Sequence, residues 1–113
     1  MNKLCYSHES SIDLIEIEKY IREELANPLA AKNTVTRITK KIRQLERFAE
    51  IGAPLSSIVG IDTDYRYLVC GSYLAFYHVN GTDVLIERIL YGGRDYLSIL
   101  FDDLPQEDID IEV

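Results

Sequence analysis

Three arginines fall at positions where a guanidinium could meet a ligand. Arg66 and Arg88 lie in segments that alternate as strands do, and Arg94 follows two glycines in a Gly-Gly-Arg-Asp turn. Arginine presents a planar fork of donors that matches two oxygens of a phosphate or carboxylate at once. Arg94 is the best exposed of the three for such a contact. Because Arg66 and Arg88 share strand faces with apolar residues, the alternative for them is a structural role, paired with Asp or Glu or reaching the rim of the sheet.

Metal and disulfide chemistry is not expected from this chain. His8 and His78 stand far apart in the sequence, and no cysteine is spaced with them as zinc ligands are. Cys5 and Cys70 both lie in apolar, strand-like segments, which favours two buried free thiols over a disulfide. We therefore expect no metal and no cofactor.

The acidic charge is concentrated at the end of the chain. Nineteen acids oppose twelve bases in the 113 residues, and six of the acids lie in residues 102–113, which contain no base. Residues 1–101, the expected folded domain, therefore carry thirteen acids and twelve bases and are nearly neutral. Ile109, Ile111 and Val113 alternate with acids in the tail. The simplest interpretation of this segment is a disordered, solvated tail. Alternatively, it adds to an open sheet edge or lies across a basic helix, where it would compete with a partner.

A long amphipathic helix carries many of the bases. Apolar residues recur at steps of three and four from Ala31 to Ala49, which predicts a helix of about five turns. Residues 28–48 contain six bases and a single acid, Glu46. Such a face is usually only solvated, but it could also contact a target or a partner. Together with Arg88, the candidate contact residues are Lys40, Lys41, Arg43 and Arg47.

The first half of the chain predicts a strand followed by a helix hairpin. Residues 3–6 form the strand, and Ser7 or Ser10 caps the first helix by accepting a hydrogen bond from a free backbone N–H. Asn27-Pro28 ends that helix and begins the next, because proline disfavours helical geometry before it yet fits a first helical turn.

The second half predicts a three-stranded meander. Gly52, Pro54 and Gly60 indicate an irregular loop, and from Asp64 the apolar period changes to two. Turns are expected at Gly71-Ser72 and Asn80-Gly81, and a short helix over residues 95–101. The fold class is therefore α+β, with the order β-α-α-β-β-β, a short C-terminal helix, and the helix hairpin packed on one face of an antiparallel sheet.

Five segments occur together in this order: SSIDLIEIEKYI, NPLAAKNTVTRITKKIRQLERF, GAPL, DYRYLVCGSYLAFYHV and VLIERILYGGRDYLSILF. Jointly they resemble the RelE/ParE superfamily of toxins from bacterial type II toxin–antitoxin systems, and the ParE branch more closely. RILYGGRD is the most characteristic part, and the resemblance covers about residues 3–101.

The resemblance implies a cytoplasmic toxin that arrests the growth of its own host and is neutralised by a cognate antitoxin encoded beside it. The antitoxin of such a pair usually wraps an extended, partly helical segment around the toxin. DNA would be bound only indirectly, through the antitoxin, since nothing in this chain looks like a base-reading element. No apolar run approaches the roughly 18–20 residues that span a bilayer, so no membrane partner is expected.

Two targets follow from the resemblance: members of the superfamily either cut messenger RNA on the ribosome or, as ParE-type members, poison DNA gyrase. A metal-independent endoribonuclease must activate a ribose hydroxyl, stabilise a crowded phosphorane and protonate a leaving oxygen. For that chemistry the resemblance implies Arg66 and Arg94 as phosphate clamps. Tyr91 lies where related toxins often have histidine, and Tyr96 could supply a second phenol.

Part of the nuclease pattern is missing. RelE-type nucleases carry lysines before the arginine that matches Arg66, whereas residues 48–65 contain no Lys or Arg. A tyrosine with an ordinary pKa of about 10 is also a poor base at neutral pH. We therefore expect interference with DNA gyrase, with ribosome-dependent mRNA cleavage as the alternative and a non-toxic binding module of the same fold as a third possibility.

Overall fold

The structure is a computed structural model that describes residues 1–101. Strand β1 (Lys3–Tyr6) leads directly into helix α1 (His8–Lys19), as predicted. The Ser7 side chain accepts a hydrogen bond from the backbone N–H of Ser10 at 2.9 Å and so caps the helix. The helix widens into a π-helical turn, η1 (Tyr20–Glu24), before it ends.

A tight turn joins α1 to the second helix. Ala26 adopts a positive φ of 51°, and the Asn27 side chain accepts a hydrogen bond from the N–H of Ala30 at 3.0 Å. Helix α2 (Pro28–Arg43) continues as a 3₁₀ turn, η2 (Gln44–Glu46). The helical segment thus ends at residue 46, before the Ala49 expected from the periodicity. The apolar stripe is confirmed, since Ala31, Ile38, Ile42 and Leu45 along it are completely buried.

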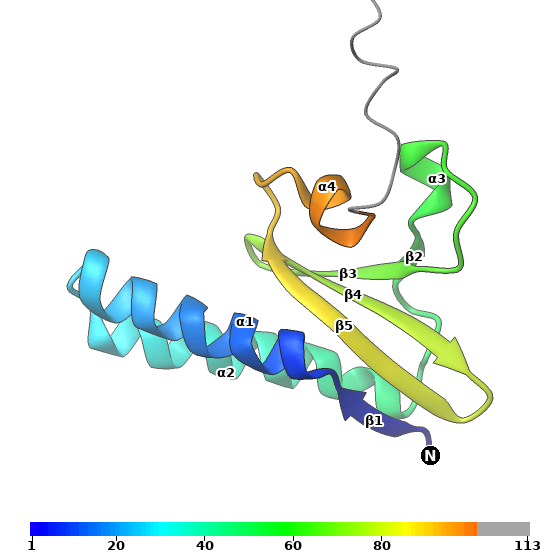
Figure 1. Cartoon of the computed structure of the whole chain (residues 1–113). Coiled ribbons are helices and arrows are strands. Elements are labelled where there is room, and N and C mark those ends of the chain that lie inside the picture. Colours follow the sequence, from blue (N-terminus) through cyan, green and yellow to red (C-terminus); the bar gives the residue numbers. More distant parts are fainter. Residues whose placement is uncertain (102–113) are drawn as a thin grey trace, which may run out of the picture.

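The remaining strands are β2 (Ala53–Pro54), β3 (Arg66–Cys70), β4 (Tyr73–Asn80) and β5 (Asp83–Tyr91), and the sheet order is β1-β5-β4-β3-β2. The predicted α+β class is confirmed (Figure 1). Within it, β1 pairs with β5 in parallel, whereas all other pairs are antiparallel. Strand β2 and the short helix α3 (Ser56–Val59) occupy the segment that was expected to be irregular.

Both hairpin turns of the meander place glycine at the first of two turn residues. Gly71 and Gly81 have φ angles of 65° and 64°, a conformation that is unfavourable for residues with a side chain. The second turn consists of Gly81 and Thr82, because Asn80 still pairs with Asp83. The predicted hairpin is therefore present, with its turn one residue later than Asn80-Gly81.

The sheet is covered on both faces (Figure 1). Side chains such as Ala75, Tyr77 and Ile86 pack with the helix hairpin in the main core. On the opposite face Phe76 and Leu90 pack with α3 and the closing helix α4 (Tyr96–Leu100) in a smaller cluster. The predicted closing helix is thus confirmed, and it gives the sheet a second covered face.

Both cysteines are free thiols, as expected, but only Cys70 is buried, whereas Cys5 is partly exposed. No helix within residues 1–101 is long and apolar enough to cross a membrane. The acidic tail, residues 102–113, lies outside the described residues.

Candidate functional site

An open hollow of about 690 Å³ separates the far end of the helix hairpin from the end of the sheet. One wall comes from α1 and η1, where Ile17, Ile21 and Leu25 recur at a spacing of four. The other wall comes from β4 and β5, where the rings of Tyr73 and Tyr91 meet edge to face, with centroids 5.9 Å apart. The hollow is therefore lined mainly by apolar and aromatic side chains, which suits the burial of another apolar surface.

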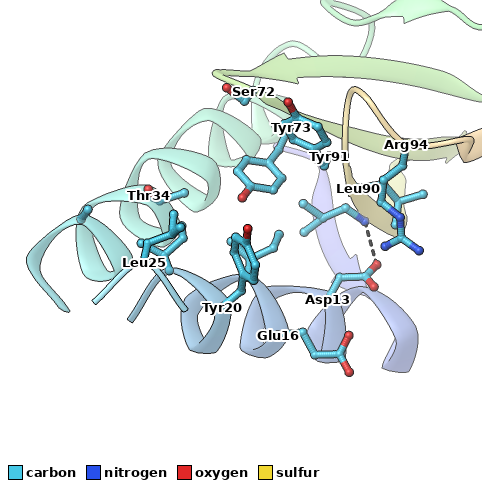
Figure 2. Close-up of a pocket in the computed structure, with 14 residues that line it drawn as sticks. Asp13, Glu16, Tyr20, Leu25, Thr34, Ser72, Tyr73, Leu90, Tyr91 and Arg94 are labelled. Atoms are coloured by element: carbon cyan, nitrogen blue, oxygen red, sulfur yellow. Dashed lines mark hydrogen bonds between the residues drawn. The ribbon is translucent and has the colours of Figure 1, made fainter. Parts of the chain in front are cut away.

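Two aromatic side chains at this hollow are strongly exposed. Tyr20 is 53% and Tyr91 52% accessible, and Figure 2 shows the Tyr20 ring directed toward the space between helix and sheet. Arg94 and Glu16 also line the hollow and supply one charge of each sign. An amphipathic segment with an apolar stripe and flanking charges would match this surface.

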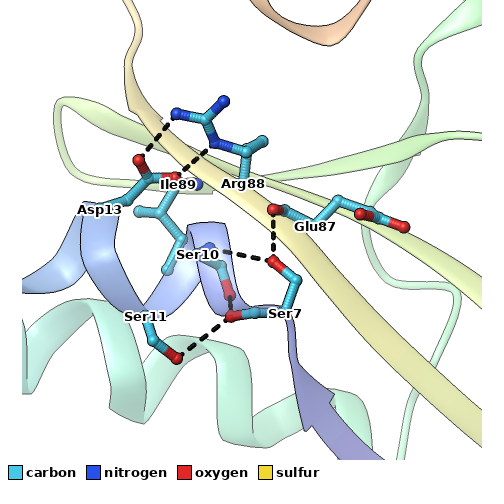
Figure 3. Close-up of polar contacts among 7 residues, drawn as sticks. All are labelled: Ser7, Ser10, Ser11, Asp13, Glu87, Arg88 and Ile89. Carbon is cyan, nitrogen blue, oxygen red and sulfur yellow. Dashed lines mark hydrogen bonds and ion pairs between the residues drawn. The ribbon is translucent and has the colours of Figure 1, made fainter.

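An ion pair beside the hollow attaches α1 to β5 (Figure 3). Asp13 accepts hydrogen bonds from Nε and Nη2 of Arg88 at 2.8 and 2.9 Å and from the backbone N–H of Ile89 at 2.9 Å. The hydrogen bond to Asp13 raises the pKa of Arg88. Arg88, a candidate contact residue, is thus paired within the fold, as the structural alternative for it anticipated.

Asp13 is a residue that the sequence reasoning missed. It lies on the buried stripe of α1, four residues before Ile17, where a carboxylate is out of place unless it has a partner. The position of a carboxylate on this stripe was the signal in the sequence that could have identified Asp13. Ser7 supports the same junction, since its hydroxyl donates to the carbonyl of Glu87 at 2.7 Å.

Arg66 has no part in the hollow. Its Nε and Nη2 donate to the carbonyl of Gly52 at 3.1 and 2.6 Å, and Nη2 also donates to the carbonyl of Glu50 at 3.0 Å. The guanidinium therefore fastens the segment after α2 to β3. The structural alternative for Arg66 was a pair with Asp or Glu or a position at the rim of the sheet, whereas its hydrogen bonds are made to backbone carbonyls.

The four proposed nuclease residues do not come together. Across the sheet, Arg66 pairs with Tyr77 and Tyr77 with Ile86, whereas Arg94 follows the far end of β5. Tyr91 shares the hollow with Arg94. Tyr96 lies on the other side of the sheet, where its ring packs on Phe76 at a centroid distance of 5.2 Å.

Burial favours the protonated form of several tyrosines. It raises the pKa of Tyr6, Tyr65 and Tyr73, the last of which lines the hollow. A phenol that acts as a base near neutral pH needs its pKa lowered. The electrostatics of these tyrosines therefore favour packing over proton transfer.

The predicted basic face of α2 is divided between two surroundings. Lys40 and Lys41 line a smaller hollow against β3. Arg43 acts on the other side, where its charge lowers the pKa of Tyr6 and partly offsets the effect of burial. Arg47 follows the end of η2 and is exposed.

His78 lies close to two carboxylates and an aromatic ring. Its Nδ1 lies 2.9 Å from the carboxylate of Asp64 and its Nε2 3.7 Å from that of Glu87. Its ring also stacks on Tyr65 at 4.1 Å. Since His78 pairs with Leu85, near the Gly81 turn, this group lies at the opposite end of β5 from Arg94.

A family model and a solved structure link the chain to one family. The model for the ParE toxin of the type II toxin–antitoxin system parDE matches residues 6–96. A chain of the chromosomal ParDE system from P. aeruginosa has a TM-score of 0.68 and 26% identity, over 80% of this chain and 96% of that one. YafQ from E. coli strain BL21(DE3) has a TM-score of 0.47 and 15% identity, over 80% and 93%. No curated protein sequence matches significantly.

The family match spans about four fifths of the chain and includes the helix hairpin, strands β2 to β5 and the Arg94 turn. It agrees with the order of segments from which the resemblance was first inferred. The chain belongs to the ParE toxin family, within the RelE/ParE superfamily of type II toxin–antitoxin systems.

Proposed function

We propose that this ParE-family toxin arrests growth by binding DNA gyrase in the cytoplasm, without cutting RNA. The observation that carries the proposal is the separation of Arg66 from Arg94. Metal-free RNA cleavage needs a phosphate clamp, a base and an acid around one scissile bond. Here Arg66 is committed to backbone carbonyls and lies at the other end of the sheet from Arg94.

Binding requires only a surface, and two surfaces are available. The basic side of α2 offers cations, while the hollow between hairpin and sheet offers apolar area with Arg94 at its border. The resemblance to ParE-type toxins, which poison gyrase, supports this target. The residues that we propose for contact with gyrase are Lys40, Lys41, Arg43 and Arg47.

A toxin of this family implies a cognate antitoxin, and we propose that the antitoxin covers the 690 Å³ hollow with an amphipathic helix. Tyr20, Leu25 and Tyr91 expose more than half of their area there. Apolar surface of this kind gains about 25 cal/mol per Å² when a partner removes it from water. The antitoxin would thus bind on the side of the molecule opposite the Gly81 turn.

The experiment that tests the target combines purified full-length chain with gyrase and supercoiled plasmid, and in parallel with translating ribosomes and mRNA. We expect inhibited supercoiling or trapped cleaved plasmid, and intact transcripts. Arg94→Ala is compared with Arg22→Ala, a control on the exposed surface of η1. Cut transcripts with undisturbed gyrase, lost in Arg94→Ala but not in Arg22→Ala, would establish the ribonuclease instead. Normal growth of cells that express the chain without antitoxin would indicate the non-toxic module.

A further inference from the structure

A second hollow, of about 310 Å³, lies between the basic side of α2 and the edge of β3. Arg37, Lys40 and Lys41 line it from the helix, and Val69 and Gly71 from the strand and its turn; we call this surface the α2–β3 trough. Arg37 Nη1 lies 3.6 Å from the point that a Cβ on Gly71 would occupy. Within residues 1–101 none of the three cations forms a salt bridge. The trough therefore has positive charge and, in residues 1–101, no anion to balance it.

The edge of β3 in this trough is open. Strand β2 pairs only with Arg66 and Tyr67, so no strand of residues 1–101 covers Val69 from that side. Cys70 and Tyr73 flank a two-residue turn and form a hydrogen-bonded pair of the antiparallel ladder. Hydrogen-bonded and non-hydrogen-bonded pairs alternate along such a ladder, so the next pair, Val69 and Leu74, is not hydrogen-bonded. The N–H and C=O of Val69 are thus directed away from β4. An added strand could bond to them.

The Val69 side chain completes the surface. It is 53% exposed and points to the face opposite Leu68 and Cys70, which are buried against the hairpin. A strand placed beside β3 would therefore find cations on one of its faces and exposed apolar surface on the other.

We propose that residues 108–113 of this same chain, Asp-Ile-Asp-Ile-Glu-Val, bind in the α2–β3 trough as an added strand. Alternate residues of a strand point to opposite faces. Three acids would then face Arg37, Lys40 and Lys41, while three aliphatic side chains cover Val69. The acids are Asp108, Asp110 and Glu112, and the aliphatic residues are Ile109, Ile111 and Val113.

The length of the intervening chain suffices. Phe101, the last described residue, packs edge to face on Tyr65 with ring centroids 5.6 Å apart, and Tyr65 immediately precedes β3. From Tyr65 to Val69 the strand rises about 13 Å, and β2 adds a width of about 5 Å. The six residues 102–107 span up to about 20 Å when extended. The tail would therefore run parallel to β3.

Weak contacts are enough for an occupant that is already attached. Exposed ion pairs are individually weak, but a short tether gives an effective concentration on the order of millimolar. The match to the ParE family model ends at residue 96, before this segment begins. The occupied trough would thus be a feature that this chain adds to the family fold, and it would cover cations proposed for contact with the target.

Hydrogen exchange of the Val69 amide in the full-length protein tests the proposal. Asp108→Asn/Asp110→Asn/Glu112→Gln should speed exchange about tenfold, because the added strand is released. Asp102→Asn/Asp103→Asn/Glu107→Gln removes the same charge outside the strand and should leave exchange unchanged. Equal exchange in the two variants and the unchanged protein would overturn the proposal.

Exchanging the charges of the tail and the trough distinguishes docking of the tail from a local loss of stability. Lys40→Glu/Lys41→Glu should release the tail, and adding Asp108→Lys/Asp110→Lys should restore protection of Val69. Raising the salt from about 50 to about 500 mM should weaken protection in the unchanged protein. Protection that grows with protein concentration would mean that a second copy supplies the strand. Protection seen only with antitoxin would mean that the antitoxin does, and either result contradicts an intramolecular contact.

Discussion

At the scale of single residues, the carboxylate of Asp13 makes the most consequential contact of the helix hairpin. It is only 7% exposed, and three donors from β5 satisfy it. A buried charge without such partners is strongly unfavourable, because it has lost water and gained nothing in return. Asp13 therefore fixes both the position of α1 on the sheet and the direction of the Arg88 side chain beside the hollow.

We expect Asp13→Asn to lower the free energy of unfolding by about 2–4 kcal/mol, since the neutral amide leaves Arg88 without its counter-charge. Urea denaturation measures the loss. Glu16→Gln removes a carboxylate from an exposed position one turn along α1 and should change stability by less than about 0.5 kcal/mol. Similar losses in both variants would mean that the Asp13 pair does not hold the helix in place.

The Cys70 thiol gives stability a specific dependence on alkaline pH. Burial raises its pKa to about 11, although the charge of Lys41 acts in the opposite direction. In the unfolded chain a cysteine titrates near about 8.5. Between these values the folded protein retains a proton that the unfolded chain has lost, so stability must fall as the pH rises.

We therefore expect the free energy of unfolding to decline more steeply between pH 9 and about 11 in the unchanged protein than in Cys70→Ala. Cys5→Ala is the matched control and should keep the steeper decline. Denaturation curves at a series of pH values give the slopes. Identical slopes in all three proteins would show that the Cys70 thiol is not protected from ionisation.

At the scale of elements, the turn between α1 and α2 contains strain that one substitution should relieve. Ala26 has a φ of 51°, and within residues 1–101 it is the sole residue other than glycine with a positive φ. This region costs an L-residue about 1–2 kcal/mol, and glycine avoids that cost while losing somewhat more freedom on folding.

Ala26→Gly should accordingly raise the free energy of unfolding by about 0.5–1 kcal/mol. Ala30→Gly, four residues later and inside α2, should lower it by up to about 1 kcal/mol, because helical geometry gives glycine no advantage there. Thermal denaturation measures both effects, and the melting temperature should rise for Ala26→Gly and fall for Ala30→Gly. A lower melting temperature for Ala26→Gly would show that the turn has another conformation.

The sequence anticipated those elements that carry a periodic pattern. The stripe from Ala31 to Leu45 and the alternation from Arg66 to Tyr91 have periods that belong to one type of element each. Strand β2 and helix α3 were missed because two and four residues are too few to show a period. The parallel pairing of β1 was missed because a strand alternates in the same way beside either kind of neighbour.

The candidate site was less predictable than the fold, since its side chains are defined by contacts between distant residues. Asp13 and Arg88 are 75 positions apart, and Arg66 reaches carbonyls 14 and 16 positions away. Residue type indicated that each arginine could hold an anion. Only the folded arrangement shows that Arg66 and Arg88 already have partners, while Arg94 lies beside the hollow.

At the scale of the whole molecule, the helix hairpin extends past the end of the sheet (Figure 1). Its near half is buried against the strands, whereas its far half forms one wall of the 690 Å³ hollow. The protein therefore presents an apolar surface with no covering element in residues 1–101. Recognition by the antitoxin can therefore be altered separately from the stability of the fold, because the side chains exposed on this surface can change without disturbing the core.

Leu25 and Leu29 allow this separation to be tested. Both are strongly exposed, at 57% and 69%, but only Leu25 lines the hollow. A charge at Leu25 would have to be buried beneath the antitoxin helix, so Leu25→Glu should weaken antitoxin binding by about 100-fold and leave the melting temperature unchanged. Leu29→Glu should bind the antitoxin as the unchanged toxin does. In cells that co-express the antitoxin, growth should then stop for Leu25→Glu alone. Full neutralisation of Leu25→Glu, or equal loss in Leu29→Glu, would place the antitoxin elsewhere on the toxin.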